Sequence, residues 1–154
     1  MSSPDLDRLD ELLRRIRHAQ QRPGWRKQLI AGSEYVTTLS TLRVMRAIER
    51  RTLTGRPISV RDVADSMAVE HSTASRAVAN AVGEGLVRKA GGDGDQRRCR
   101  LELTDRGRIA LDEITRQRRD MVAETVVGWQ DAELDLLLNL LERLAVDFER
   151  RTPA

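Results

Sequence analysis

The residues from Val60 to Gly107 limit the fold of this chain more than any other stretch. In two short segments, separated by a turn at 68–70, apolar residues recur at helical spacing. Apolar and charged residues then alternate after a run with glycines at 91, 92 and 94, which predicts a hairpin. Thr104 and Asp105 follow as an N-cap for a long helix. The order is helix, helix, hairpin, helix.

That order is the layout of a winged helix-turn-helix, so we expect a mostly α fold with a small β-hairpin wing. Ser59 and Asp62 stand at the spacing of a capping box, although Asp is shorter than the usual Glu. Glycines at 83 and 85 close the second short helix. The inward positions are expected to be Val60, Val63, Ala64 and Met67 in the first short helix and Ala74, Ala77, Val78, Ala81 and Val82 in the second.

Further amphipathic segments flank this unit on both sides. The spacing predicts helices over 5–20, from 39 to about 51, from 104 to about 126 and over 131–148, and the first helix should end near Pro23. Residues 25–40 show no sustained period, so a loop with a helical turn is expected there. We therefore predict a helical dimerisation lobe from residues 1–38 and 108–154, and a DNA-binding lobe from residues 39–107.

Composition narrows the classes of function. The 27 Lys and Arg against 24 Asp and Glu give a net charge of only +3, but five basic and two acidic residues between Leu86 and Arg100 give that segment alone +3. The single cysteine, Cys99, and two distant histidines fit neither a disulfide framework nor a metal site, and no cofactor is expected. No phosphate loop, nucleophile elbow or acid–base pair indicates an enzyme. Without a signal or membrane segment, a cytoplasmic protein is expected.

The exposed side of the second short helix carries groups suited to a DNA major groove. Arg76 and Asn80 are expected to reach base edges, and residues nearer the helix start to bind phosphate or bases. In the wing, the Asp95 carboxylate can hold the Arg97 guanidinium in one direction for a minor groove. The candidate DNA-binding residues are Ser72, Thr73, Ser75, Arg76, Asn80, Asp95, Arg97 and Arg98. A solvated polar helix and an ordinary charged hairpin are the alternatives.

Several of these motifs occur together in one family. The chain from Leu39 to Leu111 resembles the MarR family of bacterial transcriptional regulators. The motifs that carry the resemblance are Val63-Ala64 leading into Met67, Ser72-Thr73-Ala74-Ser75-Arg76, Glu84-Gly85-Leu86-Val87-Arg88, Asp95-Gln96-Arg97 and Leu103-Thr104-Asp105-Arg106-Gly107. One departure is Glu70-His71 at the start of the second short helix, where the family commonly has Ser followed by Pro.

The resemblance implies a homodimer that reads a pseudo-palindromic operator, most commonly as a repressor, with Asp95 and Arg97 as the wing pair. Apolar terminal helices also favour dimerisation, because a monomer would expose a large apolar patch. The candidate dimerisation residues are Leu6, Leu9, Leu13, Ile16, Leu137, Leu141, Leu144 and Phe148. The alternative is that both helices pack onto their own domain.

Regulators of this family often bind a small aromatic effector that relieves DNA binding. The candidates for such a pocket are Trp25, Tyr35, Arg46 and His18, although core or surface roles fit each of them as well. Cys99 is expected to be inward and unreactive. Two other functions stay open, a protein-docking module and a DNA binder without sequence preference. A docking module should carry apolar residues where this chain has Arg76 and its polar neighbours.

Overall fold

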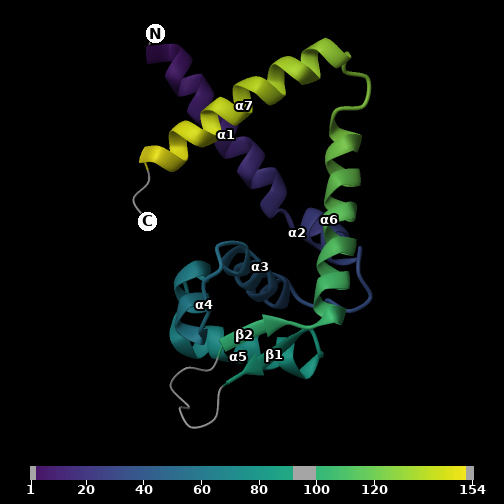
Figure 1. The fold of residues 1–154 in the computed structure, drawn as a ribbon. Coiled ribbons are helices and arrows are strands. Elements are labelled where there is room, and N and C mark those ends of the chain that lie inside the picture. The colour runs from purple at the N-terminus through teal and green to yellow at the C-terminus, as the bar shows by residue number, and fades with distance from the viewer. Residues whose placement is uncertain (1–2, 92–99, 152–154) are drawn as a thin grey trace. The chain divides into compact units, whose positions relative to one another are not determined.

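The computed structural model describes residues 3–91 and 100–151. Within them, the elements in chain order are α1 Ser3–Gln21, α2 Pro23–Ile30, α3 Leu39–Leu53, α4 Val60–Met67, α5 His71–Gly83, β1 Val87–Ala90, β2 Arg100–Leu103, α6 Asp105–Thr125 and α7 Asp131–Arg151 (Figure 1). The chain divides into two compact units, residues 1–118 and 119–154. The expected fold class, mostly helical with a two-stranded wing, is confirmed.

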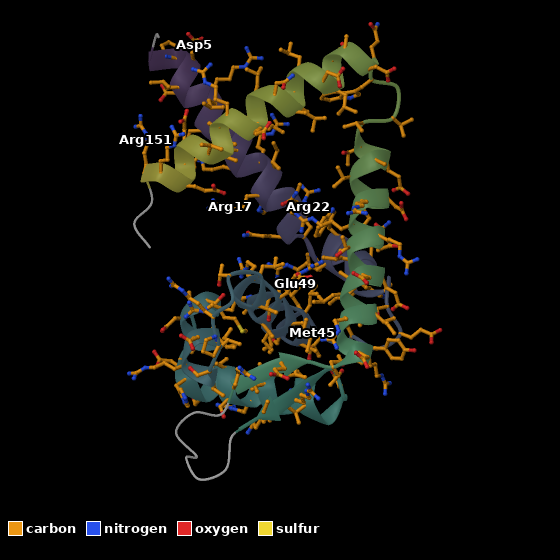
Figure 2. All side chains as sticks on the ribbon, viewed as in Figure 1. Asp5, Arg17, Arg22, Met45, Glu49 and Arg151 are labelled. Atoms are coloured by element: carbon orange, nitrogen blue, oxygen red, sulfur yellow. The ribbon has the colours of Figure 1, made fainter. Side chains whose placement is uncertain are left out.

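The core of the first unit lies among α3, α4, α5 and the hairpin (Figure 1). Met45 on α3, labelled in Figure 2, is fully buried, and Ile48 lies one turn further along the same face. α3 begins where the Thr38 side chain accepts a hydrogen bond from the Thr41 backbone N–H at 3.2 Å. Large fully buried side chains from the other elements include Val63, Val78, Leu86, Val87, Leu101, Leu111 and Ile114.

The Ser59–Asp62 capping box starts α4 as the sequence indicates, despite the short Asp side chain. Asp62 Oδ2 accepts from the Ser59 backbone N–H at 2.8 Å, and Ser59 Oγ accepts from the Asp62 backbone N–H. α4 ends at Ala68, whose φ of 53° lies in the left-handed region, and this residue makes the turn between α4 and α5. These two ends fix the length and direction of the first short helix.

The hairpin follows directly from the end of α5. Gly85 has a φ of 73°, and the Gly85 and Leu86 amides donate back to the carbonyls of Val82 and Ala81, which turns the chain into β1. β1 and β2 are antiparallel, with Val87 opposite Leu103 and Arg88 opposite Glu102. On its other side β2 donates from Leu101 N to Ile58 O at 2.9 Å, so the segment before α4 lies beside it.

Two expectations are wrong in detail. Residues 23–30 form the helix α2, whereas we expected a loop with a helical turn. Pro23 suits the first turn of a helix because its missing N–H would have no partner there, so it starts α2 after α1 has ended at Gln21. Val82 was expected to be inward but is 36% exposed, since it lies at the edge of the buried face of α5.

The second unit contains the end of α6 and the helix α7. None of the described residues of α7 is buried in the single chain, and its leucines occur on several faces. Leu136, Leu138 and Leu140 are each more than half exposed. Among residues 3–91 and 100–151, no helix has the length and apolar character needed to span a lipid bilayer.

Candidate nucleic-acid interface

One face of α5 is polar and open to solvent. Each of the five α5 residues expected to meet DNA is exposed, namely Ser72, Thr73, Ser75, Arg76 and Asn80. The opposite face is buried through Ala74, Ala77, Val78 and Ala81. The short side chains on the buried face allow α5 to approach α3 and α4 closely, which leaves its longer polar side chains outside. We call α5 the recognition helix, because it is the second helix of a helix-turn-helix.

Within residues 3–91 and 100–151, the donors on this face are not all used. The Arg76 guanidinium only bends back toward the Ser72 carbonyl, with Nε 3.4 Å from the oxygen. Glu70 takes the N-cap position and makes no side-chain cap hydrogen bond, as its replacement of the usual serine suggests. His71, the first residue of the helix, is exposed. The face therefore presents hydrogen-bonding groups to a partner.

Two arginines of α3 bind α4, the first short helix, which packs against the recognition helix. Arg43 Nη2 donates to the Met67 carbonyl at 2.6 Å, and Arg51 Nη2 pairs with Asp62 Oδ1 at 2.8 Å. The hydrogen bond from the Ser59 backbone is the main cause that lowers the pKa of Asp62, and Arg51 adds to it. Sequence reasoning missed these arginines, because their partners lie on another helix.

The base of the wing carries an Arg-Glu-Arg arrangement. Glu102 Oε2 accepts from Nε and Nη2 of Arg88 at 3.1 and 2.8 Å, and Glu102 Oε1 is 3.0 Å from Arg100 Nη2. The hydrogen bond from Arg88 lowers the pKa of the Glu102 carboxyl. The expected wing residues Asp95, Arg97 and Arg98 lie outside the described residues, as does Cys99. Their contribution to DNA binding stays a prediction.

Two of the four effector candidates line one cavity. Trp25 and Arg46 border a cavity of about 340 Å³ together with Arg17, Arg43, Arg118 and apolar residues such as Leu29 and Ile114. The Arg118 guanidinium lies 5.5 Å from the centre of the Trp25 ring, and Arg46 Nη2 donates to Thr115 Oγ1 at 2.7 Å. Figure 2 labels one of these lining residues, Arg17 on α1.

The other two effector candidates lie elsewhere. His18 borders a separate hollow along α1, and Tyr35 packs beneath the guanidinium of Arg106. Neither side chain is part of the lining of the cavity that contains Trp25. No group of three His, Cys, Asp or Glu residues suited to a metal ion occurs in the described part of the chain.

Five of the eight candidate dimerisation residues are exposed in the single chain. Leu6, Leu9, Ile16, Leu141 and Phe148 are between 40% and 56% exposed, whereas Leu13, Leu137 and Leu144 are partly covered. An isolated monomer thus leaves apolar side chains in water along α1 and also along α7.

The recognition helix, its supporting helices and the hairpin define a winged helix-turn-helix protein. Residues 37–98 match the model of the MarR family, which confirms the resemblance drawn from the sequence motifs. Members of that family are transcription regulators, which agrees with the expectation that the chain is not an enzyme. No curated protein sequence matches the chain.

Solved structures resemble the chain over nearly its whole length. A MarR family protein from Bacillus stearothermophilus is 20% identical, with a TM-score of 0.74 and coverage of 97% of this chain and 99% of that one. A MarR family transcriptional regulator from Silicibacter pomeroyi is 28% identical, with a TM-score of 0.60 and coverage of 94% and 92%.

A third similar structure concerns regulation. It is BpsR of Bordetella bronchiseptica, whose DNA binding is regulated by 6-hydroxynicotinic acid. It is 19% identical to this chain, with a TM-score of 0.55 and coverage of 90% of this chain and 98% of that one.

Proposed function

We propose that this protein is a sequence-specific DNA-binding transcriptional regulator that acts as a homodimer on a pseudo-palindromic operator, as a cytoplasmic repressor. The observation that carries the proposal is the face of α5, where five polar residues are exposed and the donors of Arg76 have no side-chain partner among the described residues. An α-helix fits the major groove, and such donors distinguish base pairs there. The polar face disfavours the docking-module alternative, which needs apolar residues at these positions.

The test begins with a duplex selected by the protein from random-sequence DNA. Its affinity is compared with that of a scrambled duplex of equal length at two salt concentrations. Tight binding of the selected duplex, retained at the higher salt, supports the proposal. Equal affinity for both duplexes with a steep salt dependence would show a binder without sequence preference. Weak binding to both duplexes would favour the protein-docking module over a DNA-binding protein.

Arg76 provides the matched variant. Arg76→Ala should relax the base preference at one position of the duplex. It should also weaken binding to the selected duplex by about 1–3 kcal/mol, because a specific base contact contributes that much. Arg116→Ala removes an exposed arginine from α6 and serves as the control. Equal loss on selected and scrambled duplexes would make Arg76 a phosphate contact.

The homodimer is supported by the uncovered apolar residues of α1 and α7. Pairing of two chains would remove this surface from water, at about 25 cal/mol per Å² of apolar area. It would also place two recognition helices about 34–36 Å apart, one turn of DNA. Light scattering after size exclusion at micromolar concentration measures the mass directly, and a monomer there would contradict this part of the proposal.

An anionic aromatic effector is supported by the cavity beside Trp25. The arginines of this cavity can pair with the carboxylate of an effector, and the indole ring of Trp25 can stack on an aromatic ring of the same molecule. The related BpsR is regulated by an acid of this class. We therefore propose that an acid of this class releases the protein from DNA, and 6-hydroxynicotinic acid is the probe. Release of the selected duplex by the probe, weakened in Arg46→Ala, supports the proposal, whereas release that is unaffected by this substitution argues against the cavity.

A further inference from the structure

Two separate contacts between distant segments lie near the C-terminal end of the recognition helix, outside its exposed polar face. Thr37 Oγ1 donates to Glu84 Oε1 at 2.6 Å, although 47 residues separate them. The Arg106 guanidinium of α6 lies 4.5 Å from the centre of the Tyr35 ring. A Cβ at Gly85, the residue after Glu84, would lie 3.9 Å from Arg106 Nη1, so this second contact is near the same helix end.

A carboxylate at position 84 is not explained by its contribution to the stability of the fold. It occupies the C-cap of α5, where the negative end of the helix dipole disfavours a carboxylate. Its second oxygen, Oε2, is buried and has no hydrogen-bond partner among the described residues. A buried acceptor without a partner lowers stability, so such a group in a native protein calls for another explanation. Among the described residues, the hydrogen bond of this carboxylate is the one that Oε1 accepts from Thr37.

The segment that carries Thr37 is itself firmly placed. Gly32 packs against α6 so closely that a Cβ there would lie 2.4 Å from Cβ of Gln117. Ser33 and Val36 are buried, and the segment ends at Thr38, which caps α3. Thr37 is therefore fixed relative to α6 and to α3, the helix against which the recognition helix packs. Because Thr37 is fixed in this way, its hydrogen bond restrains the Glu84 side chain.

We propose that Thr37 and Glu84 are positioning residues of the recognition helix, and that their hydrogen bond sets the placement of its C-terminal turn against DNA. This inference rests on the proposed DNA-binding function. Asn80 lies four residues, about one turn, before Glu84 on the same helix. Hydrogen bonds to base edges depend steeply on distance and angle, so a small shift of this turn changes base discrimination at Asn80. Contacts with phosphate tolerate the same shift, because charge interactions fall off slowly with distance.

The experiment compares three variants with a control. Thr37→Val keeps the shape of the side chain and removes the donor. Glu84→Ala removes the acceptor, whereas Glu84→Gln keeps an amide oxygen that accepts from Thr37. Thr52→Val is the control, because it also deletes a threonine hydroxyl, which bonds to the Ile48 carbonyl within α3. Far-UV circular dichroism confirms that each variant is folded.

Two readouts separate positioning from simple stabilisation. The first is the ratio of affinities for the selected and scrambled duplexes. We expect this ratio to fall about two- to tenfold in Thr37→Val and Glu84→Ala, the range that one hydrogen bond provides, with an unchanged salt dependence. Glu84→Gln and Thr52→Val should keep the ratio. The second readout is amide hydrogen exchange over residues 80–86, which should become faster in the same two variants.

Either readout can overturn the inference. Unchanged exchange over residues 80–86 in Thr37→Val would show that the hydrogen bond does not hold the helix end. Faster exchange with an unchanged affinity ratio would make the contact a purely structural one. If the wild-type protein itself prefers no duplex, the proposed DNA-binding function fails instead, and the exchange result still decides whether Thr37 restrains the helix.

Discussion

Substitution of Gly107 by alanine should disrupt the close packing of the first turn of α6 against the backbone that leads into β1. A Cβ at this position would lie 2.1 Å from the Leu86 carbonyl oxygen, far inside the 3.0 Å below which such contacts essentially never occur. The obstacle is backbone, and Leu86 is fully buried while its oxygen also accepts from Thr104 N at 3.1 Å. The α6 backbone must therefore move by almost 1 Å, which also disturbs the hydrogen bond from Gly107 N to Thr104 Oγ1. Overpacking costs about 1–3 kcal/mol and loss of a cap about 1 kcal/mol, so we expect a loss of about 3 kcal/mol.

Urea denaturation followed by circular dichroism, at one protein concentration, measures the free energy of unfolding. Gly83→Ala is the matched control, since a Cβ there meets nothing within 4 Å and the residue is helical. This control should be neutral or more stable by up to about 1 kcal/mol. If Gly107→Ala unfolded within about 0.5 kcal/mol of the wild type, the range of ordinary surface substitutions, the steric reasoning would be refuted.

Three further changes test the interior of the first unit. The pKa of Asp62 is lowered by hydrogen bonds from Ser59, so its stabilising effect is complete above the ordinary value near 3.8 and disappears as the pH falls through the lowered pKa. The unfolding free energies of wild type and Asp62→Asn should therefore differ at pH 7 and begin to approach each other only below pH 3.8, and a difference that stays constant down through the lowered pKa would contradict this. Ala68→Gly should stabilise the protein by about 0.5–1 kcal/mol, because glycine adopts a positive φ without steric cost, and a destabilised variant would argue against the left-handed turn. Met45→Ala should cost about 2–5 kcal/mol in the same denaturation assay, whereas Leu53→Ala, at a residue 82% exposed, should change little.

Local patterns predicted most of the fold because each element is bounded by its own residues. The Ser59 and Asp62 side chains act on each other within one turn, and the glycine at 85 closes α5 where the sequence indicates. The same local reasoning failed at Pro23, because a proline that ends one helix also suits the start of the next. The exposed face of α5 was predictable because the spacing of its small buried residues left only one side for the polar ones.

Contacts between distant segments could not be predicted in this way. Tyr35 was interpreted as an effector residue, yet its ring lies beneath Arg106, which is 71 positions away in the chain. Glu84 belongs to a motif of the resemblance, but nothing in the neighbouring sequence indicates its bond to Thr37. Such pairs depend on how segments far apart in the chain pack together, and hydrophobic periodicity carries no information on that.

The strand-like segment beside β2 also bears on how the molecule behaves at high concentration. Ile58 O accepts from Leu101 N, so this segment already pairs with the Leu101 amide of β2, which is not open to a strand from another molecule. Pro57 directly precedes Ile58 in this segment. A proline nitrogen has no hydrogen to donate, and a strand from another molecule therefore finds an incomplete edge to pair with. The wing sheet is thus protected on this side against open-ended growth from chain to chain.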